Sequence, residues 1–260
     1  MNKHSALIFG AVLLPAATGA SAQDSNDLRV RVGLGAQVRP KFVGADNSEI
    51  APLVNVKIAR GNTPFRFSAP TDSLGIPVIS SGGFSFGPAA NIAGSRKEKD
   101  VGADLGKVKT TLEVGAFAEQ YLTDSFRVRA ELMKGVNGHK GIVGSLSADQ
   151  IWRDGDKYVL SIGPHVRFSD GRYQRAYFGV TPAAALATDL PEYRPSGGVH
   201  TIGLEGTARV QFNPALGLFS FASYDRLAGD AAKSPIVREL GSRNQLSAGL
   251  GLSYTFVIRR

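Results

Sequence analysis

Histidines are the side chains of this sequence best suited to acid–base chemistry. Beyond residue 22 there are three of them, His139, His165 and His200. A hydrolase would need His165 or His139 within reach of a serine and an acid at the barrel rim. No serine stands in a strained Gly-x-Ser-x-Gly turn, since residues 83–87, which have this spacing, fall in the strand expected at 83–93. The sequence therefore predicts no catalytic residue, and a hydrolase remains an alternative that needs such a triad.

Metal and nucleotide motifs are also absent from the sequence. No two histidines have ligand spacing, and the chain has no cysteine. Gly33-Leu34-Gly35 and Gly249-Leu250-Gly251 lie in strand patterns and open no helix, so neither is a dinucleotide fingerprint. Asp154-Gly155-Asp156 lacks the spaced carboxylates of a calcium loop and is interpreted as a hairpin turn. We expect no cofactor and no metal.

The elements that would position any such residue are long strands. Between Gln245 and Phe256, apolar residues alternate with small and polar ones over twelve positions. This length crosses a bilayer at a tilt, and the aromatic pair Tyr254 and Phe256 suits a membrane interface. The chain continues with residues 257–260, a departure from barrel proteins that end at such an aromatic residue.

The same alternation predicts an all-β, antiparallel transmembrane β-barrel of about twelve strands, with ten as the alternative. Short turns at one end alternate with longer loops at the other, the arrangement in which the turns face the periplasm. Prolines 64, 70 and 77 blur the pairing of residues 63–80. The expected strands are 28–38, 51–60, 63–69, 73–80, 83–93, 107–121, 125–135, 141–152, 157–168, 198–212, 215–227 and 243–256.

The first residues predict export. Residues 1–22 combine Lys3, an apolar run and the small-residue site Ala20-Ser21-Ala22, the pattern of a secretory signal peptide. Residues 23–260 are then expected to form a single outer-membrane barrel domain, with no second domain and no transmembrane helix. The predicted location is the cell outer membrane.

Charge limits the partners. The net charge of +8 comes from scattered basic residues, so nucleic acid is not expected, and outer-membrane lipid and lipopolysaccharide are the expected contacts. Charges of both signs could form a packed polar core or, alternatively, line a narrow channel for small solutes. The charged residues expected on the inward face are Arg29, Arg31, Lys57, Glu113, Glu119, Arg127, Arg129, Glu131, Lys157, Arg167, Glu205 and Arg209.

Two long motifs resemble the MipA/OmpV family of outer-membrane proteins. One runs from Tyr177-Phe178-Gly179-Val180-Thr181-Pro182 to Leu190-Pro191-Glu192-Tyr193-Arg194-Pro195, and the other covers 227–245. Gly163-Pro164 and Asn137-Gly138-His139 also fit its pattern. The resemblance implies a barrel, and some members are described as scaffolds for murein-cleaving and murein-building enzymes, others as linked to adhesion or antibiotic response.

Both dense motifs fall in the predicted outward loops. Tyr177, Phe178, Pro182 and Tyr193 are expected to pack as a lid over the barrel mouth, and a ligand or surface-binding site in the same loops is the alternative. A wall-enzyme partner would instead touch the short turns or the chain ends. The predicted function is that of a non-enzymatic scaffold of the cell envelope, possible partners being murein-synthesising and murein-cleaving enzymes.

Overall fold

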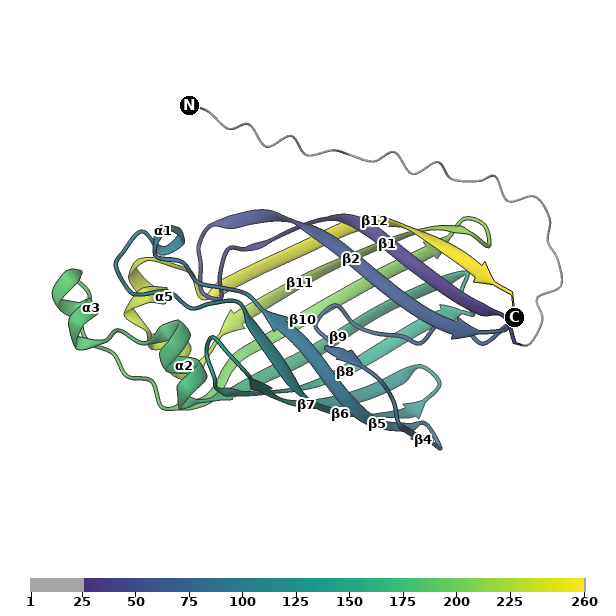
Figure 1. The fold of residues 1–260 in the computed structure, drawn as a ribbon, viewed down its shortest axis with the longest axis horizontal. Coiled ribbons are helices and arrows are strands. Elements are labelled where there is room, and N and C mark those ends of the chain that lie inside the picture. Colours follow the sequence, from purple (N-terminus) through teal and green to yellow (C-terminus); the bar gives the residue numbers. More distant parts are fainter. Residues whose placement is uncertain (1–25, 260) are drawn as a thin grey trace, which may run out of the picture.

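Antiparallel strands make up most of the chain. The computed structural model describes residues 26–259, and the signal peptide predicted at 1–22 lies outside them. Twelve strands form one sheet in the order β2-β1-β12-β11-β10-β9-β8-β7-β6-β5-β3, with β4 paired to β5 (Figure 1). The long strands are β1 (Leu28–Pro40), β2 (Ser48–Arg60), β5 (Phe84–Ala93), β6 (Thr111–Thr123), β7 (Phe126–Gly135), β8 (Ile142–Asp154), β9 (Tyr158–Asp170), β10 (Gly197–Gln211), β11 (Leu216–Leu227) and β12 (Asn244–Ile258). The predicted all-β, antiparallel fold class is confirmed.

The two-residue period decides which face of each strand points outward. In β12, Leu250 and Leu252 are exposed on the outer surface, whereas Gly251, Ser253 and Thr255 are buried. β12 pairs with β1 on one side and β11 on the other, and its last residues, Val257 and Ile258, continue the pairing with β1. An apolar outer face and a polar inner face are what a sheet in a bilayer requires.

Residues 63–80 depart from the prediction. The strand expected at 63–69 is absent, and the one expected at 73–80 is reduced to β3 (Leu74–Gly75) and β4 (Ile79–Ser81). Proline has no backbone N–H and cannot sustain a ladder, and three prolines occur in this stretch. Apolar alternation at residues 65, 67 and 69 is real, but it faces the barrel interior from an irregular segment.

The sheet curls without closing. Within residues 26–259, β2 pairs only with β1, and the other margin of the sheet is formed by β3 and β4 against β5. No described strand pairing joins β2 to that margin. The wall therefore has a gap along one side, which we call the side opening.

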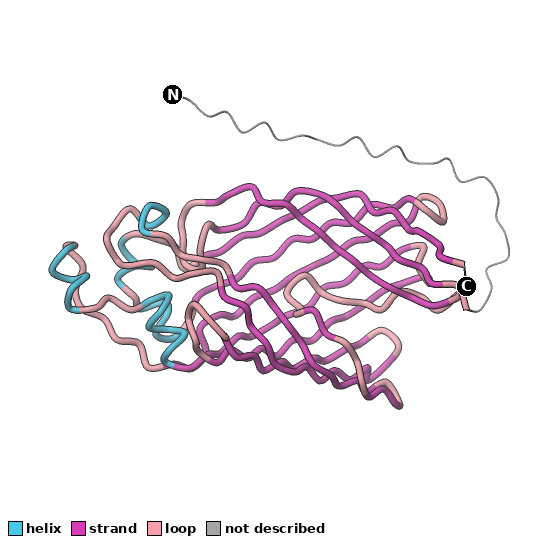
Figure 2. Tube along the Cα trace, viewed as in Figure 1, coloured by secondary structure: helices cyan, strands magenta, loops and turns pink. Residues whose placement is uncertain are grey.

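Turns and loops separate to the two ends, as Figure 2 shows by the helices gathered at one end only. The short turns are 82–83, 124–125, 155–157 and 212–215, and the described C-terminal end lies with them. The helices of the opposite end are α1 (Glu98–Val101), α2 (Gly171–Phe178), α3 (Pro182–Ala187), α4 (Gly229–Lys233) and α5 (Pro235–Glu239). Among the described helices, none has the length and apolar character to cross a membrane.

Candidate functional site

An irregular segment crosses the lumen. Residues 63–73, which we call the plug, leave the end of β2 and reach the inner side chains of distant strands. The amide of Phe65 donates to Asp156 at 2.9 Å, beside β9. The hydroxyl of Thr71 donates to Glu205 of β10 at 2.7 Å. The plug therefore bonds to parts of the wall, the β8–β9 turn and β10, that are far from it in sequence.

Arg127 of β7 anchors the plug through buried charge. Its side chain is fully buried, and its guanidinium lies 2.8 Å from Asp72 of the plug and 2.6 Å from Asp149 of β8. The aromatic ring of Phe67 packs against the guanidinium at 4.6 Å from its ring centre. Each buried charge thus has a partner, which offsets the cost of removing it from water.

A second arginine extends this network along β7. Arg129 lies 2.7 Å from both Glu119 of β6 and its own strand neighbour Glu131. Arg66 of the plug reaches the other oxygen of Glu119 at 2.6 Å. Ser73 donates its hydroxyl to Glu131 at 2.7 Å. Removing Arg129 would leave Glu131 without its ion-pair partner.

Most inward charges predicted from the alternation do lie inside. Arg31, Glu113, Glu119, Arg127, Arg129 and Glu205 are buried. Lys57, Glu131, Arg167 and Arg209 line the interior cavity, and Arg29 pairs with Asp156 at 2.9 Å. Lys157 was predicted wrongly: it belongs to the exposed 155–157 turn because β9 begins one residue later.

The prediction missed three members of the network. Asp149 shares the inward face of β8 with Ser147 and Ile151, so the alternation carried the necessary signal. Arg66 and Asp72 lie in the plug, Arg66 where a strand had been expected at 63–69 and Asp72 in the link before the strand expected at 73–80. Nothing in a strand pattern places an irregular segment inside a barrel, so no sequence signal identified them.

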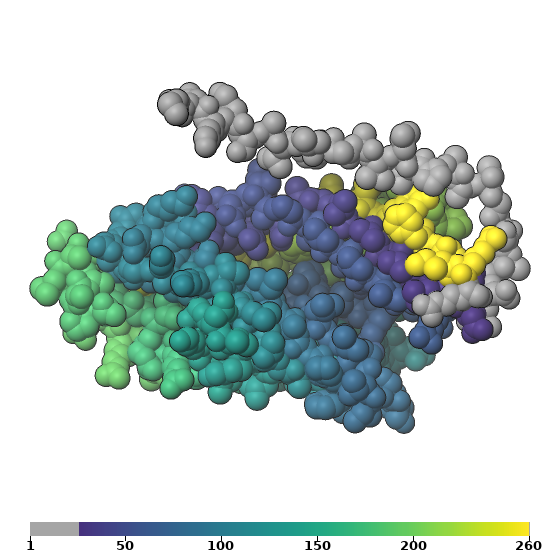
Figure 3. All heavy atoms as spheres, viewed as in Figure 1, coloured from purple at the N-terminus to yellow at the C-terminus, as the bar shows by residue number. Residues whose placement is uncertain are grey.

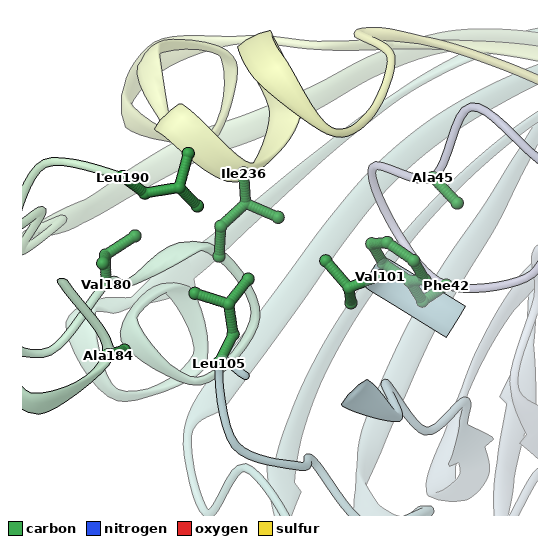
Figure 4. Packing of buried hydrophobic residues seen from close by; sticks show 8 residues of the cluster. All are labelled: Phe42, Ala45, Val101, Leu105, Val180, Ala184, Leu190 and Ile236. Carbon is green, nitrogen blue, oxygen red and sulfur yellow. The ribbon is translucent and has the colours of Figure 1, made fainter. Parts of the chain in front are cut away.

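The loops opposite the short turns pack into a cap. It comprises 41–47, 94–110, 171–196 and 228–243, and green atoms of the third loop project farthest in Figure 3. Figure 4 shows Leu105, Val180, Leu190 and Ile236 pointing toward one another from three of these loops. Burial of apolar side chains from separate loops holds the cap together.

The lid predicted from the family motifs is present, with one exception. Tyr177 and Phe178 are fully buried, and Tyr193 packs at the edge of the apolar cluster. Pro182 is exposed and instead begins α3, where the hydroxyl oxygen of Thr181 accepts from the amide of Ala184. Proline at the first helical position suits this role because its missing N–H has no helical partner.

Two buried polar side chains of the cap bond to backbone carbonyls. The hydroxyl of Tyr177 donates to the carbonyl of Gly94 at 2.6 Å, and burial raises the pKa of Tyr177 to about 12. Arg96 donates to the carbonyls of Tyr177 and Leu105 at 2.9 and 3.0 Å. Burial lowers the pKa of Arg96 from its usual value. These bonds fix the cap rather than present reactive groups.

Each histidine has a structural contact. His139 accepts from the amide of Gly141 at Nδ1, so its Nε2 proton faces Glu113 at 2.9 Å. His165 Nε2 lies 2.6 Å from Asp225. The hydrolase alternative required one of these two rings to bond to a serine. In residues 26–259 neither ring does.

The third histidine contacts a serine but lacks an acid. His200 Nδ1 lies 3.2 Å from the hydroxyl of Ser169, and both side chains are buried. No described carboxylate forms a hydrogen bond or ion pair with this ring. In the described part of the chain, no three His, Asp or Glu side chains group as a metal site. Asp154-Gly155-Asp156 is the β8–β9 turn, with Gly155 at a φ of 50°.

The described residues enclose a larger and a smaller cavity in the barrel. The larger, about 1460 Å³, which we call the chamber, lies between the cap residue Tyr177 and the plug residue Phe67. It reaches the side opening, whose margins are 53–58 of β2 on one side and 74–77 with 91–94 on the other. The smaller cavity, about 420 Å³, lies at the short-turn end.

Comparisons with known proteins give low-identity structural likenesses. An outer-membrane channel from Pseudomonas putida F1 is 10% identical, with 93% of this chain and 100% of that chain aligned at a TM-score of 0.42. A loop-deletion mutant of the outer-membrane protein OmpT of Vibrio cholerae is 9% identical, with 91% and 100% aligned at 0.39. The translocator domain of the autotransporter NalP from Neisseria meningitidis is 15% identical, with 92% and 90% aligned at 0.36.

Sequence comparison identifies the family. No curated protein matches the chain. The family model described as MltA-interacting protein MipA matches residues 32–256, which is most of the sequence and nearly all of the barrel. The chain therefore belongs to the MipA family and is an outer-membrane β-barrel protein.

Proposed function

We propose that the protein is a non-enzymatic scaffold that binds a murein-cleaving or murein-building enzyme on the periplasmic side of the outer membrane. The family description, MltA-interacting protein, suggests a murein transglycosylase as the partner. Short turns face the periplasm in barrels of this kind, so the partner would bind at that end.

The plug is the observation that carries this proposal. Residues 63–73 cross the lumen and bond to inward side chains of several strands. Because the interior charges of the barrel hold this segment across the lumen, the barrel is poorly suited to the diffusion of solutes through it. Its rigid framework is suited to presenting a fixed surface to another protein.

The smaller cavity, at the short-turn end, is a suitable binding site for the partner, and we call it the short-turn pocket. Its lining includes residues of β1, the 155–157 turn, the 212–215 turn and β12. Both side-chain polar atoms of Gln211 and the Nε of Arg29 are buried there without a hydrogen-bond partner among the described residues. Phe212 and Lys157 are exposed beside them. A partner group entering the pocket could satisfy the unpaired atoms, and the exposed apolar rim would add contact area.

The test is capture of a murein transglycosylase from envelope extracts by the full-length barrel, followed by measurement of its Kd. Combining Lys157→Glu with Gln211→Ala should weaken binding about tenfold, which is about 1.4 kcal/mol. Arg194→Glu, an equal charge reversal on the exposed cap, is the matched control and should leave Kd unchanged.

Two results would contradict the proposal. Repeated failure to recover any murein enzyme with a folded barrel would remove the scaffold role. Equal weakening by Arg194→Glu would place the contact at the cap or in general electrostatics, and not at the short-turn pocket.

A further inference from the structure

The side opening leaves two strand margins without partners. β2 pairs only with β1, and the facing margin is formed by 74–77 and 91–94. Hydrocarbon cannot satisfy backbone N–H and C=O groups, so such an edge persists in a bilayer only where it lines a wet cavity or meets polar groups. The chamber behind the opening supplies that cavity.

Several carboxylates that line the chamber have partners. Asp72 is held by Arg127 and Glu131 by Arg129 at 2.7 Å, so these charges offset one another locally. Asp225 lies 2.6 Å from His165.

Three cations behind β2 contrast with these pairs. Arg31 and Lys57 are direct cross-strand partners in the β1–β2 register, an arrangement that like charges disfavour. Within residues 26–259, no carboxylate lies within 4.0 Å of Arg31, Lys57 or Arg209. Their contacts are neutral: Arg31 to Thr255 at 3.2 Å, Lys57 to the carbonyl of Arg66 at 2.9 Å, and Arg209 to Asn55 at 3.2 Å.

Arg209 has unused bonding capacity. Its Nη1 is buried without a hydrogen-bond partner among the described residues, while its Nη2 donates to Asn55 on the inward face of β2. Arg31, Lys57, Asn55 and Arg209 all line the chamber. This cluster is a site of uncompensated positive charge, which an anion would stabilise.

Apolar side chains border the same opening on the outside. Val54 and Val56 of β2 are more than half exposed, as are Leu74, Ile76 and Ile92 of the facing margin. The opening therefore joins a lipid-facing apolar rim to a basic interior. An apolar rim followed by a basic interior is complementary to a molecule with hydrocarbon chains and an anionic headgroup.

We propose that the side opening is a lateral portal for an anionic phospholipid of the surrounding membrane. Its phosphate would enter the chamber and contact Arg31, Lys57 and Arg209. Its acyl chains would stay on the apolar rim. The headgroup would also provide polar partners at the unpaired edge of β2, which explains how an open sheet margin is tolerated in the bilayer.

The test uses the full barrel in nanodiscs, with native mass spectrometry to count lipids retained after mild extraction. The wild type should retain phosphatidylglycerol in preference to phosphatidylcholine. Lys57→Gln with Arg209→Gln should lower that retention about tenfold. Lys134→Gln, which removes an exposed lysine of β7 far from the cluster in sequence, should retain lipid like the wild type.

A second variant tests the path independently of charge. A Cβ added at Gly94 meets no atom within 4 Å, so Gly94→Trp introduces a bulky side chain at the portal margin with space at its point of attachment. It should reduce retention with every cation in place. Heat-modifiable migration on gels confirms that each variant has folded.

Three outcomes would overturn the proposal. Equal phosphatidylglycerol retention in the double variant would show that the cations bind no headgroup. Full competition by inorganic phosphate at the lipid concentration would indicate a site for soluble anions. A lipid-free dimer that protects β2 would show that a second copy covers the edge.

Discussion

The continuous wall from β5 through β12 to β2 and the segment between β2 and β5 follow different structural rules. In the wall, each strand buries a polar face inward and exposes an apolar face outward, and backbone bonds to the neighbouring strands, on one side only for β2, fix its register. The plug has few backbone ladder bonds and is held by side chains, chiefly through Asp72 and Thr71.

The wall and the plug should therefore differ in how strongly a single substitution affects them. The wall would keep its architecture under most single changes, because its bonds are numerous and repeated. The plug depends on a few buried charges, so its position should respond sharply to their removal. The same contrast accounts for the side opening: residues that could have completed the wall as strands enter the lumen instead.

Replacing the plug should have the largest effect. Glycine and serine substituted at residues 64–72 would remove every buried anchor of that stretch while keeping its length. Because the chain has no cysteine, Ser161→Cys on the inner face of β9 provides a clean reporter. A water-soluble maleimide should label it about tenfold faster in the replaced protein.

The control for that experiment is Thr123→Cys, exposed near a short turn, which should label equally in both backgrounds. If Ser161→Cys stays protected without the plug, the wall alone excludes solvent. If the barrel with the replaced plug cannot assemble, the plug is needed for folding of the wall. The wall and the plug would then not be independent.

Arg127→Met should have the next largest effect. It leaves Asp72, Asp149 and Glu119 buried without their shared cation, which should lower the free energy of unfolding by about 3–5 kcal/mol. Urea unfolding followed by gel migration measures this loss. Arg226→Met, at an exposed arginine of β11, should cost no more than about 1 kcal/mol. Similar losses in both variants would mean that the network adds nothing specific.

Sequence pattern accounts for the wall but only partly for the interior. Alternation predicts the long strands because their two faces meet different solvents. It also identifies Arg127 and Glu119 as inward, since they lie in regular strands. Alternation at residues 65, 67 and 69 predicted a strand where the chain instead crosses the lumen, so neither the position of Asp72 nor the side opening could be inferred. The cap was predicted from motif residues, and its buried Tyr177 and Phe178 agree.

Asp230→Asn should have the smallest effect, confined to the cap. The Asp230 carboxylate accepts from the amide and hydroxyl of Ser196 at 3.0 and 2.9 Å, joining α4 to the 171–196 loop. The backbone bond from Ser196 is the main reason that the pKa of Asp230 is lowered, with Lys233 also contributing. A lowered folded pKa means that this stabilisation is present above the ordinary carboxyl pKa of about 3.9 and is lost as pH falls through the folded value.

Hydrogen exchange of the 189–196 segment should detect that difference. At about pH 7, Asp230→Asn should exchange faster there than the wild type, and the two should converge as the wild-type carboxylate becomes protonated. Asp104→Asn, at an exposed acid of the cap with no described ion pair, should match the wild type at every pH. A difference in exchange that does not depend on pH would show that the loss comes from the shape of the Asn side chain and not from the missing charge. Exchange changes inside the barrel wall would show that the effect of Asp230→Asn is not confined to the cap.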